Sequence, residues 1–492
     1  MRRKQPWNAL YANLGSLRKP ISYKLSTLTI CQEWTWHLSS GKFVCMSEEK
    51  QLRKGSSVRH TRAIQKNRVS HPVAAPSDEQ IRERIQDMVH PATLAQVSYF
   101  HRLGLRERTL SFVVMVAFVL EMVWRQIGSV NALARMVQKE AILWEQPRKV
   151  SQQALSQRLT SLPSELFLRV LLDILPKAQE RWMKRERPLS AELLWAAERY
   201  RAVLAVDGST LDALIRKLGL LQDLPENPLA GRMTALLDLC TRLPEKIWYE
   251  SDPKAHDQRF WEDILSVLLP GSLLIFDKGY LNFAIFVKLS QAKVKFITRT
   301  KTNLVYTLER AMIRNAAVHD SLVWIGEDET RQQVRLIEVL YRGTWYRYMT
   351  NELDEKKLPT PYVVALYWQR WRIEDAYNIV KRLLGLAYFW CGAQNAVEMQ
   401  LWVTWLLYVV LVDLTDAVAE ALHLPFSAIS MEMIYRSLYF FTNARQRGET
   451  DDVVAYLASE AKFFGILKRQ RKDDHPSPLV FVPKLLTELS NP

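Results

Sequence analysis

The feature that most constrains the fold is the order in which apolar runs and amphipathic stretches alternate between residues 202 and 298. Short apolar runs bounded by turn residues are typical of buried strands, and apolar residues three and four apart favour helices. The expected strands are 202–206, 233–240, 246–249, 272–276 and 295–298, and the expected helices are 258–268 and 282–291. Three strands, a helix, a strand, a helix and a strand predict a mixed sheet with helices on both faces.

Residues 300–359 depart from this alternation and are predicted to form a β-rich insertion. Residues 334–341 and 344–349 are rich in β-branched and aromatic side chains. Arg342-Gly343 between them favours a hairpin turn. An insertion built around this hairpin is therefore expected to interrupt the domain.

Two helical stretches follow the insertion. The first opens at Pro361 and runs to about Leu384, and the second, which is very apolar, covers about 396–422. The element order is that of a ribonuclease-H-like domain. We therefore expect an α/β protein whose ribonuclease-H-like catalytic domain is built from two segments, 199–299 and 360–422.

Residues 90–198 predict an all-α N-terminal domain, because their apolar residues recur at helical spacing. Within it, 149–159 and 164–175 form two short helical patterns separated by Ser161-Leu162-Pro163. Ser151 suits the N-cap of the first. Two short helices preceded by basic residues can form a helix-turn-helix that reads DNA, and they can equally be members of a helical bundle. Both interpretations stay open.

The positive charge is concentrated at the N-terminus. Of the net charge of +15, residues 1–70 contribute +11, from 14 Lys+Arg against 3 Asp+Glu. Residues 1–89 are therefore predicted to be a basic, flexible arm, which either contacts phosphates or is a solvated tail. Met46, followed by Ser-Glu-Glu-Lys, would serve as an alternative start, in which case 1–45 would not be translated.

Two further compositional features exclude other classes. The four cysteines contain no CxxC pair and no Cys/His cluster at zinc spacing, so neither a disulfide framework nor a zinc site is expected, and a cytoplasmic location fits. The apolar runs 112–120 and 401–412 are shorter than the roughly 20 residues that cross a bilayer. We expect both to be buried core helices and expect no membrane partner.

Three carboxylates stand at positions that favour metal chemistry. Asp207 ends the first expected strand, Asp277 ends the fourth, and Glu374 lies on the helix after the insertion. In a sheet of this topology the first and fourth strands are neighbours, so the two aspartates should meet. Carboxylates of this kind hold Mg²⁺, and two ions about 4 Å apart can clamp the attacking and leaving oxygens of phosphoryl transfer.

Each acid also has an ordinary explanation. Asp207 before Gly208 and Asp277 near Gly279 are typical turn residues, and Glu374 could be a solvated side chain paired with a neighbouring arginine. The joint placement of the three at two strand ends and one helix favours the metal site.

A spaced motif surrounds the third acid. Tyr367, Arg370, Glu374 and Lys381 form the pattern Tyr-x2-Arg-x3-Glu-x6-Lys. Offsets of three, four and seven residues keep all four side chains near one helix face. An acid among basic and phenolic donors suits a metal-bound phosphate.

With these residues the chain resembles the bacterial insertion-sequence transposases of the DDE type, in the branch that carries this signature. The resemblance covers about 200–415 and includes Asp207-Gly208-Ser209 and the pair Thr350-Asn351. It also includes Asp277-Lys278-Gly279-Tyr280, where the family usually has Arg in place of Lys278.

The resemblance implies an activity and partners. It implies cut-and-paste movement of an insertion sequence, by strand cleavage and strand transfer on double-stranded DNA at terminal inverted repeats and a target. It implies a homodimer on DNA, to which the helical C-terminal region 423–492 could contribute, in a bacterial cytoplasm and at the nucleoid when DNA-bound.

The resemblance also implies residue roles. By analogy Asp207, Asp277 and Glu374 are the catalytic metal ligands for two Mg²⁺ ions, which Mn²⁺ could replace, and Tyr367, Arg370 and Lys381 bind DNA phosphates. This branch passes through a DNA hairpin with an extruded base, which an aromatic ring can receive by stacking. Trp345 or Tyr346 is the candidate, but not both, because strand neighbours face opposite ways. Both could instead be packing residues of the hairpin.

Two other classes of protein compete with this interpretation. A non-catalytic DNA-binding protein derived from such a transposase would keep the fold and the basic charge, although the presence of all three acids argues against decay. A glycoside hydrolase with two carboxylates would account for the many tryptophans, but not for the arginines and lysine around Glu374. Dependence on a metal would separate the hydrolase from the transposase.

Overall fold

The computed structural model describes residues 81–106, 108–211, 231–252, 255–386, 389–390, 393–468 and 476–487. The chain divides into two compact units, 1–54 and 55–492, and every described residue belongs to the second. The predicted basic arm up to residue 80, and with it the alternative start at Met46, lies outside the described residues.

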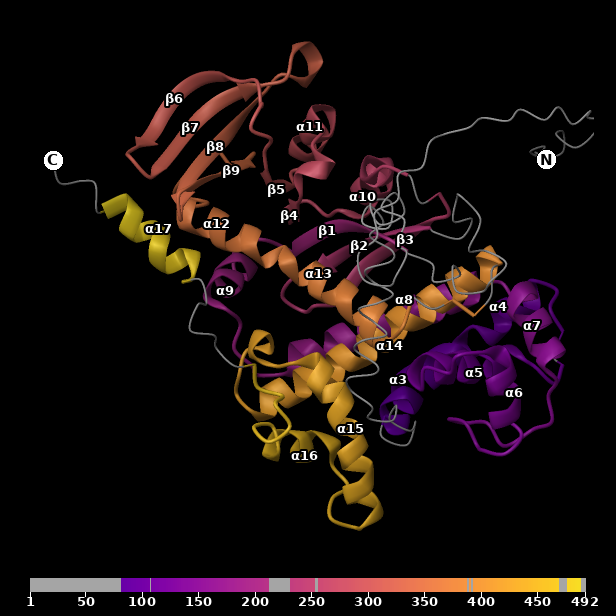
Figure 1. Ribbon diagram of the computed structural model, residues 1–492. Helices are drawn as coiled ribbons and strands as arrows, with labels where there is room; N and C mark the ends of the chain where they lie inside the picture. Colours follow the sequence, from indigo (N-terminus) through magenta and orange to yellow (C-terminus); the bar gives the residue numbers. More distant parts are fainter. Residues whose placement is uncertain are drawn as a thin grey trace, which may run out of the picture. The chain divides into compact units, whose positions relative to one another are not determined.

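The described residues form one mixed sheet of nine strands (Figure 1). The strands are β1 (Val203–Thr210), β2 (Arg232–Asp238), β3 (Pro244–Glu250), β4 (Leu273–Phe276), β5 (Lys295–Arg299), β6 (Thr307–Arg314), β7 (Val318–Ile325), β8 (Gln332–Tyr341) and β9 (Thr344–Thr350). Their order in the sheet is β3-β2-β1-β4-β5-β9-β8-β7-β6. The α/β prediction is confirmed, and so is the prediction that the first and fourth strands are neighbours.

The central strands explain why the sheet needs cover on both faces. β1 is antiparallel to β2 and parallel to β4, and β4 is parallel to β5. All four residues of β4 are buried, as in strands of parallel sheets that are covered on both sides. Successive side chains of β1 alternate between two cores: Val203 and Ala205 join one, and Leu204 and Val206 join the other.

Helices of different parts of the chain supply these two covers. α10 (Trp261–Val267) and α11 (Phe283–Gln291) contribute to the core that contains Leu204 and Val206. The opposite core contains α12 (Thr360–Gln369), α13 (Trp371–Asn378), the π-helical turn Ile379–Leu383 and α14 (Gln394–Ala421). The predicted helix from Pro361 to Leu384 is thus two α-helices that meet at Arg370 and end in a π turn.

The β-rich region continues the same sheet. β9 pairs antiparallel with β5, with Ile297 opposite Thr350. The predicted hairpin is present as β8 and β9, and its turn residues Arg342 and Gly343 both have positive φ, as a tight two-residue turn requires. β6 and β7 were not predicted, because β6 is mostly exposed and carries charged side chains that hide its strand pattern.

The N-terminal part of the described chain is helical, as predicted. It contains α3 (Arg82–Ala95), α4 (Val97–Arg102), α5 (Phe112–Trp124), α6 (Val130–Met136), α7 (Gln152–Ser161), α8 (Glu165–Lys184) and α9 (Ala191–Ala197). Ser151 caps α7 by accepting the N–H of Ala154 at 3.2 Å. α7 and α8 both pack against α14 as members of a bundle, and a DNA-reading role for them stays a prediction.

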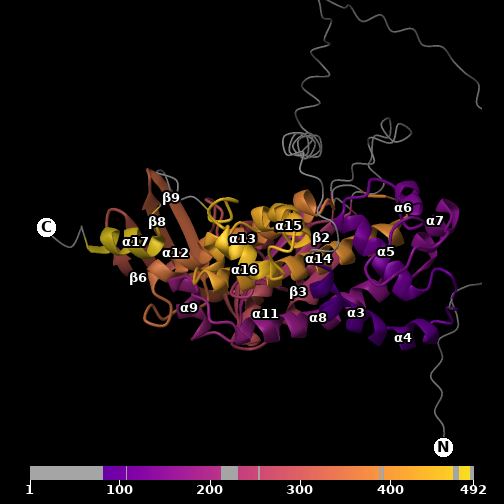
Figure 2. The same cartoon turned by 90° about the horizontal axis from the view of Figure 1, so that it is seen from below.

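The C-terminal part adds α15 (Met431–Gln446), α16 (Val453–Ser459) and α17 (Pro478–Thr487). α15 and α16 pack against α14 (Figure 2), whereas α17 packs against α12. The predicted domain bounds and a dimerisation role for 423–492 stay predictions.

α14 is the central helix of this half of the protein. By length and hydropathy it is the one described helix that could cross a membrane, so the expectation that its apolar run is too short was wrong. The apolar window of the helix is completely buried inside the protein. The other expectation, a buried core helix, is what the structure shows.

Two buried aspartates on α14 fasten the helical half to it. Asp413 accepts hydrogen bonds from Arg84 of α3 at 2.6 Å, from Arg181 of α8 at 3.1 Å and from Arg185 at 2.6 Å. Asp416 accepts a second hydrogen bond from Arg185 at 3.1 Å. Burial raises the pKa of Asp413, but the arginines outweigh burial and hold that pKa below its usual value.

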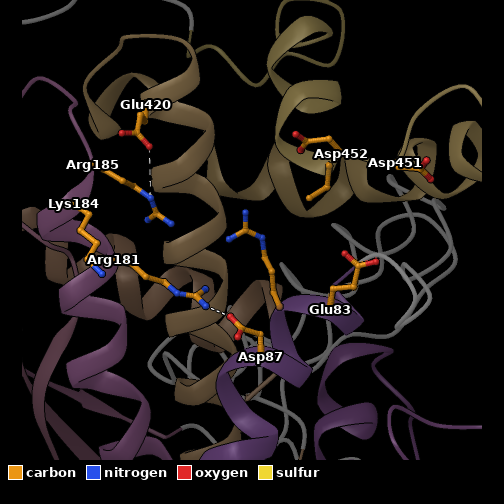
Figure 3. A pocket seen from close by; sticks show the side chains of 10 residues that line it. Glu83, Asp87, Arg181, Lys184, Arg185, Glu420, Asp451 and Asp452 are labelled. Carbon is orange, nitrogen blue, oxygen red and sulfur yellow. Dashed lines mark hydrogen bonds and ion pairs between the residues drawn. The ribbon is translucent and has the colours of Figure 1, made fainter.

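The three arginines that bind Asp413 also line a hollow of about 830 Å³ (Figure 3). Its lining includes four basic residues, Arg84, Arg181, Lys184 and Arg185, and five acidic ones, Glu83, Asp87, Glu420, Asp451 and Asp452. Figure 3 shows Arg181 directed at Asp87 and Arg185 directed at Glu420. The arginines are therefore committed to carboxylates, and the hollow reflects how the helices are joined.

Asp413→Asn is expected to lower the free energy of unfolding by about 3–5 kcal/mol, because three arginines lose their shared buried counter-charge. Chemical denaturation followed by tryptophan fluorescence measures the loss. The control is Glu432→Gln, which breaks the half-exposed helical pair with Arg436 and should cost at most about 1 kcal/mol. Equal losses in the two variants would contradict a fastening role for Asp413.

Candidate active site

The two aspartates emerge side by side from the centre of the sheet. The parallel register pairs Val206 of β1 with Phe276 of β4, so Asp207 and Asp277 each come directly after this pair. Asp277 follows the end of β4 as predicted, but the prediction that Asp207 ends its strand was wrong, because β1 continues to Thr210. Adjacent strands lie about 4.8 Å apart, so the two side chains lie close together. This place, where the chain leaves β4 beside β1, is here called the edge. Asp207 accepts the N–H of Gly208 at 2.9 Å.

The segment from α12 to the π turn, here called the signature helix, lies against this edge. It presents Tyr367, Arg370, Glu374 and Lys381 to the edge. Arg370 donates to Asp207 at 3.0 Å with one terminal nitrogen and to Glu374 at 2.7 Å with the other. The Tyr367 hydroxyl donates to Asp277 at 3.2 Å. Lys381 donates to the Thr210 carbonyl at 2.5 Å. The structure therefore brings all six predicted metal and phosphate residues to one edge, and their functional roles stay predictions.

Tyr377 fixes the helix at this position. Its hydroxyl donates to the carbonyl of Asp207 at 2.5 Å and accepts the N–H of Ala235 at 3.0 Å, so it joins α13 to both β1 and β2. Tyr377 was not predicted from the sequence. A signal was present, because Tyr377 follows Glu374 by three positions and so lies on the same helix face.

A fourth carboxylate, Asp257, also lies at the edge and was not predicted. It precedes α10 and accepts a hydrogen bond from Nε of Arg232 at 2.8 Å. A Cβ built on Gly208 would lie only 2.0 Å from its Oδ1. A side chain at 208 would therefore have to displace the carboxylate of Asp257 from its position beside Gly208.

Burial controls the charge of Asp207. Burial raises the pKa of Asp207 to about 6, although Arg370 and the Gly208 N–H lower it, and the nearby Glu374 and Asp257 raise it further. A carboxylate with this pKa is costly to ionise without an additional cation. Burial and Asp277 likewise raise the pKa of Tyr367, so its hydroxyl keeps its proton and acts as a donor.

The donor set suits a hard cation, but the arrangement is not a preformed metal site. No group of three His, Cys, Asp or Glu residues in the described chain is arranged to hold a metal ion. Instead, the guanidinium of Arg370 binds both Asp207 and Glu374, and its buried Nε has no hydrogen-bond partner. That the three acids hold an ion stays a prediction, and Arg370 would have to release two of them.

The two aromatic candidates of β9 face different surroundings. Tyr346 lines a hollow of about 470 Å³, here called the aromatic pocket, whose other rings are Tyr341, Tyr348, Tyr367, Trp368, Trp371 and Phe481. The guanidinium of Arg299 lies 5.1 Å from the Tyr346 ring. Trp345 is instead stacked on His319 with ring centres 4.7 Å apart. Only Tyr346 therefore shares a pocket with Tyr367, the residue bonded to Asp277.

Comparison with known proteins finds a family similarity over part of this region. Residues 230–410 match the family described as "Transposase DDE domain". The match includes Asp277 and Glu374 and begins after Asp207. This part of the chain is therefore similar to the DDE domains of transposases, which argues against a glycoside hydrolase.

Individual relatives are more distant. The chain is 30% identical over 149 residues to "Putative transposase y4zB" of Sinorhizobium fredii, which is 29% of this chain and 42% of that protein. It thus spans less than half of this relative. Among solved structures, a piggyBac transposase synaptic complex with hairpin DNA is 11% identical, with a TM-score of 0.39 over 82% of this chain and 86% of that chain. A likeness this weak carries no argument here.

Asp207→Asn should change stability in a pH-dependent manner in the metal-free protein. The folded-state pKa of about 6 lies above the unfolded value near 3.8, so the stability associated with the protonated form is present at low pH and lost as pH rises through 6. The variant should therefore gain stability relative to the wild type between pH 4 and pH 7. Denaturation curves of both proteins across this range measure the difference, and a flat difference would contradict a raised pKa of Asp207.

Proposed function

We propose that the protein is a DDE transposase that excises and integrates an insertion sequence by cleaving and joining DNA strands at terminal inverted repeats. The observation that carries this proposal is the meeting of Asp207, Asp277 and Glu374 with Arg370 and Tyr367 at one sheet edge. The strand order and directions of β1 to β5 support a ribonuclease-H-like catalytic core.

The three acids would hold two Mg²⁺ ions, with Mn²⁺ able to substitute. When bound, the ions activate a water or a 3′-hydroxyl and stabilise the leaving oxygen. Once the charges of Asp207 and Glu374 were compensated, both carboxylates would release Arg370. The freed guanidinium then forms a bidentate contact with a DNA phosphate, while Lys381 and the Tyr367 hydroxyl hold neighbouring phosphate oxygens.

Double-stranded DNA is the proposed partner, both as terminal repeats and as target. The net charge of +15 favours a polyanion, and the largest part of it lies in the N-terminal arm. A homodimer on DNA, with contributions from 423–492, and a bacterial cytoplasmic location at the nucleoid belong to the same proposal.

The aromatic pocket is the proposed receiver of an extruded base in a hairpin-forming reaction. Tyr346, Arg299 and Tyr367 all line this pocket. A base stacked there would therefore lie next to Tyr367, whose hydroxyl is bonded to Asp277. Trp345 is less suited, because its ring is already stacked on His319.

A non-catalytic DNA-binding protein derived from a transposase is the second candidate. The observation that favours it is the Arg370 bridge, which neutralises two of the three acids without any ion. Metal-dependent cleavage of DNA that carries the element's own terminal repeats separates the two candidates.

Glu374→Gln should abolish strand cleavage and leave binding to terminal repeats within about twofold of the wild type. The change keeps the shape of the side chain and removes the charge that holds an ion, whereas affinity for DNA comes mostly from phosphate contacts elsewhere. Cleavage in Mg²⁺ and a gel-shift titration measure the two effects, with Glu432→Gln as the matched control. Cleavage at the wild-type rate would make Glu374 a helix residue without a catalytic role.

Tyr346→Ala should slow hairpin formation by at least about fivefold, because stacking on an aromatic ring contributes about 1–3 kcal/mol per base. 2-Aminopurine placed at the terminal base reports the stacking directly, and its quenching should be lost. Trp345→Ala should have a smaller effect on both readouts. The reverse ranking would move the base to the His319 side of β9.

A further inference from the structure

A short segment before and at the start of α10, residues 257–261, contacts the chain beyond both predicted metal aspartates. Two of its side chains donate to backbone carbonyls of the turn that follows Asp277: Gln258 to Leu281 at 2.9 Å, and Trp261 to Tyr280 at 3.2 Å. The turn after β4 is thus held by side chains of this segment, which is here called the bracing segment.

The first residue of the bracing segment, Asp257, makes the contact with the other aspartate's strand. Its Oδ1 accepts Nε of Arg232 at 2.8 Å and also a terminal nitrogen of the same guanidinium. Arg232 begins β2, opposite Thr210 of β1. Only 18% of the Arg232 side chain and 21% of the Asp257 side chain are exposed. A charged pair that is joined through two nitrogens and largely shielded from water holds its geometry better than an exposed pair does.

The carboxylate of Asp257 occupies space that side chains at 208 and 279 would need. Its Oδ1 lies where a Cβ at 208 would be, and its Oδ2 lies 3.7 Å from the place of a Cβ at 279. Gly208 directly follows Asp207, and Gly279 is the second residue after Asp277. One carboxylate therefore lies between the two chain segments that carry these aspartates.

Asp257 lies on the face of the sheet opposite the signature helix. The apolar residues of β1 alternate between the two cores, and the pairing of β1 with β2 stays regular to the end of β1. By this alternation Asp207 points toward the signature helix and position 208 points toward α10. Asp257 is therefore behind Asp207 and not among the groups that face Arg370, a place suited to a supporting group and not to a ligand of the same ion.

We infer that Asp257 is a positioning residue of the candidate active site. Held by Arg232, its carboxylate sets the spacing of the segments that carry Asp207 and Asp277, and so the affinity of these aspartates for a divalent cation. Groups behind metal ligands typically change metal affinity by about 10–100-fold when they are replaced. The inference rests on the proposed function, because the cation is the Mg²⁺ of that proposal.

The first test compares two double variants of the full chain that have the same net charge. Arg232→Gln with Asp257→Asn keeps a planar group between the two glycines, whereas Arg232→Gln with Asp257→Ala empties this space. Titration with Mn²⁺ without DNA, followed by electron paramagnetic resonance of the free ion, measures affinity. The first variant should bind Mn²⁺ within about threefold of the wild type, and the second at least about tenfold more weakly.

Two controls define what this titration reports. Asp277→Asn shows which part of the Mn²⁺ binding belongs to the site, and Glu180→Gln with Lys184→Gln, which removes an exposed pair on α8, should leave the affinity unchanged. Equal affinities of the two double variants would overturn the positioning role, since the carboxylate would then act by its charge or not at all. Mn²⁺ binding that is independent of Asp277 would overturn the metal site of the proposed function, and this inference with it.

The second test needs neither metal nor DNA. A methyl group at 208 has to displace the Asp257 carboxylate in the wild type, whereas the space is free in an Asp257→Ala background. Gly208→Ala should therefore lower the thermal midpoint of the wild type and should not lower that of Asp257→Ala, because alanine in a strand loses less conformational entropy than glycine. Asp257→Ser provides a second background if Asp257→Ala does not fold. Equal shifts in all backgrounds would show that the carboxylate moves freely, which would overturn the positioning role and leave the transposase proposal standing.

Discussion

The parallel pairing of β1 with β4 is the constraint on which the rest of the site depends. It places Asp207 and Asp277 at the same level on neighbouring strands although 69 residues lie between them. Because both strands are buried on both faces, neither can shift its register by one residue without turning apolar side chains the wrong way. The position of the two aspartates is thus as well defined as the core itself.

The second determinant is the attachment of the signature helix to this edge. The Tyr377 hydroxyl holds α13 to β1 and β2 by hydrogen bonds with two backbone groups of these strands. Arg370 holds the helix through Asp207 and Glu374. The two attachments differ in kind. The first is buried and neutral and can persist throughout a reaction, whereas the second uses the groups that an ion and a phosphate would need, so it is the attachment that must open.

The ion network of Asp413 has a different role from the site. Arg84, Arg181 and Arg185 all bind this one buried carboxylate, which joins α3 and α8 to α14. The charges of this network are matched within the protein, whereas Asp207 and Glu374 share a single guanidinium.

The sequence by itself determined the central strands, the helices on both faces and the six residues at the edge, because hydrophobic period and spacing are local properties. It could not determine Asp257, Tyr377 or the charge state of Asp207. These depend on which side chains meet across the fold: a carboxylate pressed on Gly208, a hydroxyl reaching two strands, and burial that raises a pKa. The sequence left Trp345 and Tyr346 equivalent, and only the packing of His319 against one and of the aromatic pocket against the other distinguished them. Tertiary structure likewise decided that the predicted insertion extends the central sheet, since pairing between β5 and β9 joins residues 49 to 53 positions apart.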